Sequence, residues 1–267
     1  MGRIDTIFEE LRGANRKALM PFVCAGHPRP DSLAEILLSL QDAGASVVEV
    51  GFPFSDPIAD GPIIAAAMHK AIQAGCTPGQ VLDQISSVRE RLRIGLVAMV
   101  SISIMQRLTS GSGPSEVVMR YRDAGIDGFI FPDLPLEESD SWRAAAAEAG
   151  LSCTFLISPT TPPDRAAKIA QASSGFLYLL ARSGITGERS EMPDLSGRIA
   201  QLRQVSKLPI AVGFGISTPE HVRHVVQTAD AAIVGSALVR RVSDASPDQS
   251  PAQVAGDFCR QLAAGLA

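Results

Sequence analysis

The stretch AGASVVEVG (43–51) ends a predicted helix on small residues and then enters a short apolar strand. The same transition recurs in AGIDGFIFPD (124–133) and in TADAAIVGSA (228–237). The strand in each stretch is apolar at consecutive positions, which is typical of strands that are covered on both faces. This pattern indicates a parallel sheet whose strands alternate with helices.

Eight short runs rich in apolar and β-branched residues are predicted to be strands, and they lie at 18–23, 47–52, 96–101, 128–131, 153–157, 176–180, 209–214 and 231–235. Most are separated by segments of helical character, such as DSLAEILLSLQDAG (31–44). In that segment Ser32 and Glu35 predict a capping box, and Gly44 predicts the C-terminal stop. We therefore predict one α/β domain over residues 1–267, a (β/α)₈ TIM barrel with extra helices.

An open, doubly wound sheet is the alternative architecture. That fold carries a glycine fingerprint, GxGxxG, directly after its first strand. The sequence at that place is CAGHPRP (24–30), so the barrel is favoured.

Several segments exceed the plain strand–helix repeat. The loop PFSDPIADGP (53–62) precedes an extra predicted helix at 63–74. The polar stretch TGERSEMPD (186–194) is expected to be a mobile loop, and a C-terminal helix is predicted at 252–266.

The composition indicates a compact soluble protein that binds neither nucleic acid nor membrane. The chain has 46% hydrophobic and 19% charged residues, and its formal net charge of −4 provides no basic field to attract nucleic acid. The longest apolar run, at 94–105, is shorter than the roughly 20 residues of a membrane-spanning helix. The N-terminal segment is acidic where a secretory signal is apolar, so a cytoplasmic location is expected.

The cysteines are scattered along the chain, which predicts buried free thiols in a reducing compartment. They are Cys24, Cys76, Cys153 and Cys259. Gly2 and Thr6 match the pattern for N-terminal myristoylation. An amphipathic helix that begins within 5–11 explains this segment more simply.

Glu49 is a candidate catalytic residue, because a carboxyl group on the apolar strand 47–52 faces the barrel interior or its mouth. An unpaired acid among β-branched side chains is costly, which favours a general acid/base of raised pKa over an ion-paired core glutamate. Asp60, in IADGP (58–62), is a second candidate, although a turn-forming aspartate explains it equally well on local grounds. Asp56 is expected to be a loop residue and not a catalyst.

Glycine-rich loops at the ends of the last predicted strands indicate a phosphate site. Such loops expose backbone N–H groups, and the helix that follows adds the positive end of its dipole. The residues in these loops are Thr186, Gly187, Phe214, Gly215, Ile216, Gly235 and Ser236. The alternative interpretation is that these glycines only permit tight turns.

Two other kinds of barrel chemistry find no support in the sequence. A Schiff-base aldolase needs a lysine at the barrel mouth, but Lys17 and Lys207 precede strands, and Lys70 and Lys168 fall in predicted helices. The histidines are dispersed, so no metal ligand set is predicted. The remaining interpretation is an enzyme that acts on a phosphorylated substrate with carboxyl groups as its catalytic residues.

Motifs along nearly the whole chain resemble the α subunit of tryptophan synthase. They are VEVGFPFSDPIADGP (48–62), PDLPLEES (132–139), YLLARSGITG (178–187), VGFGIS (212–217) and IVGSALV (233–239). The resemblance implies a (β/α)₈ barrel that cleaves indole-3-glycerol phosphate to indole and glyceraldehyde 3-phosphate. It implies that Glu49 and Asp60 are the catalytic pair and that this chain holds no metal or other cofactor.

The same resemblance implies the substrate contacts. Phe22 and Tyr178 would lie near the indole and glycerol parts of the substrate. The phosphate contacts would come from Gly187, Gly215, Gly235 and Ser236. The segment 186–194 would be a closing lid that carries Thr186.

The chemistry of this cleavage is consistent with carboxyl groups alone. Protonation of the indole ring at C3 creates an electron sink within the substrate, so the C–C bond breaks as the side-chain hydroxyl loses its proton. Glu49 would give the first proton and take the second, which calls for a pKa raised by an apolar site. Asp60 would accept the N–H of the ring.

The resemblance also implies a partner, a pyridoxal-phosphate-dependent β subunit that receives the indole in an α₂β₂ complex. Pro53, Asp56 and Pro57 would contact it. The segment 99–116, MVSISIMQRLTSGSGPSE, replaces the Tyr-Tyr-Asn-Pro type of stretch usual in this contact region. Docking is therefore expected in an altered form.

Two alternative functions remain open from the sequence. One is another barrel enzyme that acts on a phosphosugar. The other is a catalytically weak barrel that mainly activates a β-like partner. The presence of both Glu49 and Asp60 argues against the second, because an activator needs neither.

Overall fold

The computed structural model describes residues 2–57, 60–109, 111, 113–181, 194–213, 215–246 and 248–267. Within these residues nine strands form one parallel sheet, in the order β5-β4-β3-β2-β1-β9-β8-β7-β6. The strands are β1 (Ala18–Cys24), β2 (Val47–Gly51), β3 (Gly95–Met99), β4 (Gly128–Ile130), β5 (Ser152–Thr154), β6 (Leu156–Ile157), β7 (Leu177–Leu180), β8 (Ile210–Gly213) and β9 (Ala231–Val234).

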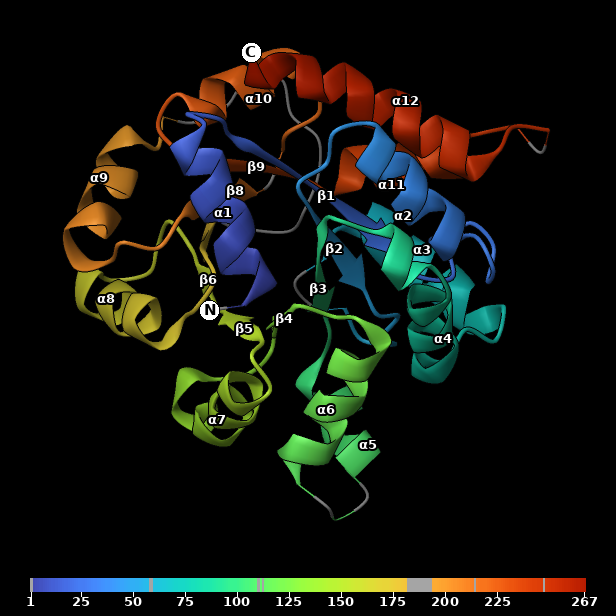
Figure 1. Cartoon of the computed structure of the whole chain (residues 1–267), viewed down its shortest axis with the longest axis horizontal. Helices are drawn as coiled ribbons and strands as arrows, with labels where there is room; N and C mark the ends of the chain where they lie inside the picture. The colour runs from blue at the N-terminus through green and yellow to red at the C-terminus, as the bar shows by residue number, and fades with distance from the viewer. Residues whose placement is uncertain are drawn as a thin grey trace.

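The two ends of this strand order are halves of one chain segment, because only Phe155 separates β5 from β6. β5 pairs with β4, and β6 pairs with β7, so the sheet curls into a barrel of eight chain segments (Figure 1). The backbone N–H of Phe155 donates to Ser173 Oγ at 3.3 Å, outside the strand ladder. The predicted barrel is confirmed, and the predicted single strand at 153–157 is two short ones.

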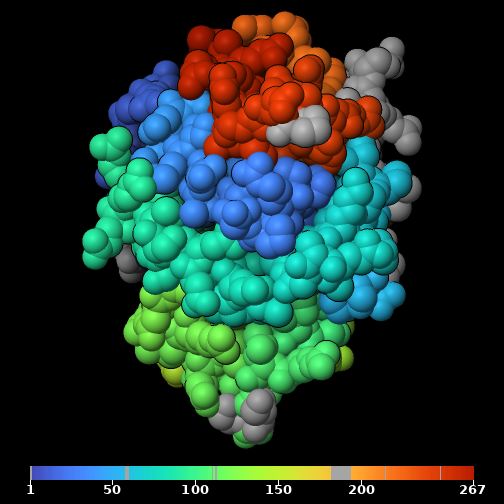
Figure 2. Space-filling model, turned by 90° about the vertical axis from the view of Figure 1, so that its right-hand side faces the viewer, coloured from blue at the N-terminus to red at the C-terminus, as the bar shows by residue number. Residues whose placement is uncertain are grey.

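Most helices lie on the outer side of the sheet, and α1 lies across one end of the barrel (Figure 1). They are α1 (Arg3–Gly13), α2 (Leu33–Asp42), α3 (Pro62–Gln73), α4 (Pro78–Val88), α5 (Ile102–Thr109), α6 (Pro114–Ala124), α7 (Asp140–Glu148), α8 (Pro163–Ala172), α9 (Ser196–Val205), α10 (Pro219–Val226), α11 (Ser236–Ser243) and α12 (Pro251–Ala263), with short 3₁₀ turns η1 (Arg89–Arg91), η2 (Leu136–Glu138) and η3 (Ala264–Leu266). Figure 2 shows α12, α2, α4 and α6 stacked side by side on one flank. No described helix has the length and apolarity to cross a membrane.

The start of α2 differs from the prediction. Ser32 has helical backbone angles and its side chain accepts no capping hydrogen bond; its hydroxyl donates to the carbonyl of Arg29 at 2.8 Å. The N–H of Leu33 is bound instead by Gln84 Oε1 of α4 at 3.1 Å. The predicted capping box is therefore wrong. Gly44 does end the segment in a left-handed conformation, with φ of 96°.

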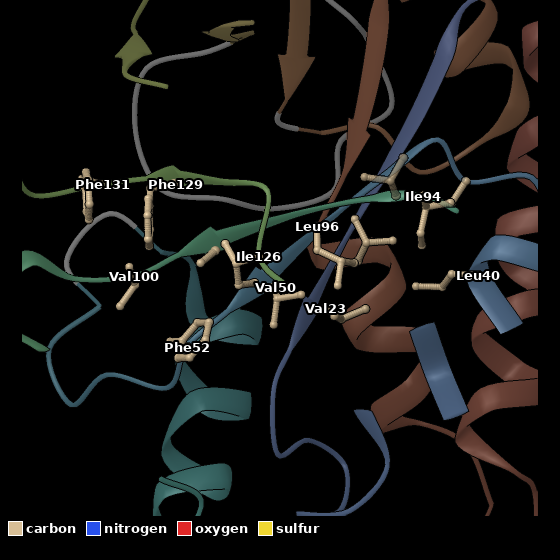
Figure 3. Packing of buried hydrophobic residues seen from close by; sticks show 14 of the residues in the cluster. Val23, Leu40, Val50, Phe52, Ile94, Leu96, Val100, Ile126, Phe129 and Phe131 are labelled. Carbon is tan, nitrogen blue, oxygen red and sulfur yellow. The ribbon is translucent and has the colours of Figure 1, made fainter. Parts of the chain in front are cut away.

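Each strand buries one set of side chains outward and the other inward. Figure 3 shows Val23, Val50 and Leu96 from three neighbouring strands, which belong to the same buried cluster as Leu40 of α2. The inward set forms a separate cluster that includes Val47. This two-sided burial explains why the strands are apolar at consecutive positions.

Helices close the barrel interior at both ends. At the amino ends of the strands, Ile4 and Phe8 of α1 join the inner cluster, and the ring of Phe8 lies 6.0 Å from that of Phe176. At the other end, Phe22 of β1 packs with Met68 of α3. The interior is therefore apolar above and below the middle of β2.

Gly51 illustrates how closely the inner layer is packed, and it supplies a test of the fold. A Cβ atom at Gly51 would lie 2.4 Å from Phe22 Cζ. We expect Gly51→Ala to lower the free energy of unfolding by about 1–3 kcal/mol, because a buried ring must move. Urea denaturation measures this change.

The control is Gly197→Ala on α9, where nothing lies within 4 Å of the added atom. This variant should be neutral or slightly more stable. Adding Phe22→Leu to Gly51→Ala should restore part of the loss. Equal stability of Gly51→Ala and wild type would contradict the packing described here.

Candidate active site

Glu49 points into the barrel from the middle of β2. It pairs in register with Phe22 of β1 and with Val97 of β3, and it is fully buried. Neither carboxyl oxygen has a hydrogen-bond partner among the described residues. Burial therefore raises the pKa of this carboxyl group well above its ordinary value. The inward orientation predicted for Glu49 is confirmed.

Asp60 lies just before α3, and its backbone N–H donates to the carbonyl of Pro57 at 3.0 Å. Burial raises the pKa of its carboxyl group to about 6. The pKa of the Cys24 thiol is raised by burial and then by the charges of Cys76 and Asp60. Asp60 is thus close enough to the end of β1 to be felt electrostatically there.

The charges of both acids act on Tyr178 of β7. Burial raises the pKa of its phenol first, and the charges of Glu49 and Asp60 raise it further. The ring occupies space left by Gly213, where a Cβ atom would lie 2.6 Å from the phenol oxygen. The structure therefore brings Glu49, Asp60, Phe22 and Tyr178 to one part of the barrel.

Two glycine-containing turns follow the neighbouring strands β8 and β9. Gly215 has a left-handed φ of 83°, and Ile216 beside it is buried. Gly235 immediately precedes α11, and Ser236 is its first residue. The first N–H groups of a helix have no partner within the helix, so this end of α11 can bind an anion.

The remaining members of the predicted phosphate site cannot be placed. Thr186, Gly187 and Phe214 lie outside the described residues, as does the predicted lid 186–194 apart from Asp194.

The predicted partner contacts share the loop between β2 and α3 with Asp60. Pro53 is buried, Asp56 is exposed and Pro57 is half-buried. The hydroxyl of Ser55 donates to Asp56 Oδ2 at 3.4 Å. A partner bound to this loop would therefore touch the segment that carries Asp60.

The sequence reasoning missed the role of Asp133, which fixes the start of α5. Ser101 Oγ donates to Asp133 Oδ2 at 2.5 Å, and the N–H of Ile102 donates to Asp133 Oδ1 at 2.9 Å. This carboxylate caps α5 from the loop after β4, and its charge complements the helix dipole. Capping signals are sought next to a helix in the sequence, and Asp133 lies 31 residues away.

The other titratable groups do not form a second reaction centre in the part of the chain that the structure describes. Lys70 and Lys168 lie on α3 and α8, and Lys17 Nζ donates to the carbonyl of Ala229 at 2.8 Å. No group of three or more His, Cys, Asp or Glu side chains among the described residues could hold a metal ion.

These features define a class of protein. A closed (β/α)₈ barrel with two carboxyl groups of raised pKa inside it, and with glycine turns at adjacent strand ends, has the architecture of a barrel enzyme for phosphorylated substrates.

Comparison with known proteins defines the family. The family model described as tryptophan synthase alpha chain matches residues 8–265, and the chain belongs to this family. A tryptophan synthase alpha chain of Synechococcus sp. (strain CC9902) is 46% identical over 257 residues, which cover 96% of this chain and 94% of the relative. That of Rhodopirellula baltica is 42% identical over 275 residues and 98% of each chain.

Solved structures agree with this assignment. A chain of Mycobacterium tuberculosis tryptophan synthase superimposes with a TM-score of 0.89 at 30% identity, covering 99% of this chain and 98% of that one. The alpha subunit of Legionella pneumophila gives 0.87 at 33% identity, with 100% and 98% coverage. The protein is accordingly a carbon–carbon lyase of tryptophan biosynthesis. The alternative of a weakly catalytic activator is not supported.

The raised pKa of Asp60 makes stability depend on pH. The unfolded chain releases this proton near pH 4, whereas the folded protein holds it until about pH 6. Unfolding free energy is therefore lost as the pH rises through this window, by about 3 kcal/mol in total. We expect Asp60→Asn to gain that much relative to wild type between pH 4 and pH 7, measured by urea denaturation.

Asp83→Asn on the exposed face of α4 is the matched control and should follow the wild-type pH dependence. A constant difference between Asp60→Asn and wild type at every pH would contradict the burial of the Asp60 carboxyl group.

Proposed function

We propose that Glu49 and Asp60 are the catalytic groups that cleave indole-3-glycerol phosphate to indole and glyceraldehyde 3-phosphate. The observation that carries this proposal is the fully buried Glu49 carboxyl group, which no described residue hydrogen-bonds. Burial raises the pKa of such a carboxyl group and so favours its protonated form, which can act as a general acid.

The different surroundings of the two acids support different roles. Glu49, in the protonated form that burial favours, donates its proton to C3 of the indole ring, which makes the ring an electron sink. The C–C bond then breaks as the substrate hydroxyl gives its proton to the Glu49 carboxylate, so Glu49 ends protonated as it began. Asp60, with a pKa of about 6, is ionised at neutral pH and accepts the ring N–H.

The substrate would span from the barrel interior to the glycine turns. Phe22 and Tyr178 would line the indole and glycerol part, beside Glu49. The phosphate would be bound by Gly187, Gly215, Gly235 and Ser236, next to Phe214 and Ile216, and Thr186 would close over it on the lid 186–194. The N-terminal end of α11 supports this placement, because its dipole favours a dianion.

We further propose that this chain needs no cofactor of its own and acts in the cytoplasm as a single domain, 1–267. The pyridoxal phosphate of tryptophan synthase belongs to the beta chain. The beta chain would receive the indole within an α₂β₂ complex. Pro53, Asp56 and Pro57 would form one contact, and α5, held in place by Asp133, would form the other.

Glu49→Gln tests the catalytic proposal. The amide has the shape of the neutral carboxyl group but cannot give up its proton, so indole release should fall by a factor of about 10²–10⁴ or more. Indole formation from indole-3-glycerol phosphate measures the rate, and far-UV circular dichroism checks the fold.

The control is Glu35→Gln on the exposed side of α2, which should keep wild-type turnover. Turnover by Glu49→Gln within a few-fold of wild type would disprove the assignment of Glu49.

The partner proposal has a separate test. Adding the purified cognate β subunit should raise the rate of indole-3-glycerol phosphate cleavage and give a complex detectable by light scattering. Asp56→Lys should weaken this complex about tenfold, because an exposed contact charge is reversed. Asp83→Lys on α4 is the control. If wild-type chains show neither complex nor activation, the β subunit is not the partner.

A further inference from the structure

A second hollow lies outside the barrel, between α11, α12 and the loop that follows β8. Its volume is about 580 Å³. It is lined by Ser217, Thr218, Ala237, Arg240, Arg241, Asp244, Ala245, Gln249, Val254 and Phe258, and we call it the outer cleft. None of the residues proposed above for substrate or catalysis lines it. Figure 1 shows α11 and α12 side by side, and their contact supports one wall of the outer cleft.

Arg241 is a charged residue that lines the outer cleft. Its guanidinium carbon lies 5.1 Å from the centre of the Phe258 ring, so the ring holds the charged group by a cation–π contact. Arg241 makes no salt bridge with any described residue. A positioned guanidinium with no carboxylate partner favours a bound anion.

Hydrogen-bond donors and helix ends add to this field. Thr218 is the N-terminal cap of α10, and Gln249 comes two residues before α12, so the positive ends of two helices lie at the outer cleft. Gln249 Oε1 accepts the N–H of Ser246 at 3.0 Å, which leaves the amide nitrogen of Gln249 to donate to a ligand. The hydroxyl of Ser217 lies 3.4 Å from His221 Nδ1 and is therefore already engaged within the protein.

The rest of the lining limits the kind of ligand. Val254, Phe258 and Ala245 give the outer cleft an apolar part, which can accommodate the uncharged portion of a small ligand. The carboxylate of Asp244 also lines the outer cleft and would repel a second anionic group. A ligand with one compact anionic group is therefore favoured over a polyanion.

We propose that the outer cleft is a second anion site, which binds the phosphate group of a small phosphate monoester. Arg241 binds the phosphate oxygens, and the side-chain amide of Gln249 supplies a further donor. The site is separate from the substrate's phosphate turns, although it adjoins them along the chain. Ser217 follows Ile216, and Ala237 follows Ser236.

Inorganic phosphate is the probe, and ¹⁵N-labelled full-length protein is titrated with it by NMR. We expect two groups of amide signals to shift with separate affinities: one around 215–216 and 235–236, and one around 240–249 and 254–258. The second group reports the outer cleft. The same titration with chloride at equal ionic strength should leave it unshifted.

Arg241→Gln is expected to weaken phosphate binding at the second group at least tenfold and to leave the first group unchanged. The matched control is Arg260→Gln on α12, whose guanidinium binds Asp257 at 2.8 Å on the surface. This variant should titrate as wild type. Indole release is measured in parallel, so failure of the proposed lyase function is read separately.

Three results would overturn the proposal. The 240–258 signals could stay unshifted while the phosphate turns saturate. Arg241→Gln could bind phosphate as wild type does. Chloride could shift the same signals to the same extent, which would indicate general ionic screening and no site.

Discussion

Glu49 carries two carboxyl oxygens inside the barrel, and no described residue donates a hydrogen bond to either. Burial penalises the charged form of such a group, so the pKa of Glu49 is raised well above its ordinary value. The surroundings of Glu49 must remain apolar for that reason. Its inward register on β2, opposite Phe22 and Val97, follows from this single requirement.

The barrel meets the requirement through its closure at both ends. α1 covers the amino ends of the strands with Ile4 and Phe8, which are both buried. At the other end, Phe22 packs with Met68 of α3. Gly51 and Gly213 are small because the rings of Phe22 and Tyr178 occupy the space of their side chains. The raised pKa of Glu49 and the tight packing around it thus have one structural cause.

The sequence allowed the barrel and the inward position of Glu49 to be predicted, because both rest on local periodicity. A strand apolar at successive positions is covered on both faces, and one carboxyl group in it stands out. The split of the fifth strand at Phe155 was not predictable in this way. Its N–H is bound by Ser173, a contact set by the packing of a distant segment.

The same distinction applies to helix ends. Ser32 was predicted to cap α2, but its hydroxyl donates to the carbonyl of Arg29. The N–H of Leu33 donates to Gln84 Oε1 of α4 instead. Asp133 caps α5 from the loop after β4. The N–H groups at a helix start can donate to any acceptor that the tertiary structure brings near. A residue next to the helix in sequence is only one of the groups that can cap it. The start of α5, within the segment 99–116, could not be predicted from that segment alone, because Asp133 lies outside it.

The chain is acidic overall, yet its substrate is an anion, so recognition must depend on fields that act over a few ångströms. α11 provides two such fields. Its N-terminal N–H groups, at Ser236, face the end of β9, and its last turn carries Arg240 and Arg241 into the outer cleft. The two fields act at opposite ends of one short helix, so each anion is bound by its own local donors.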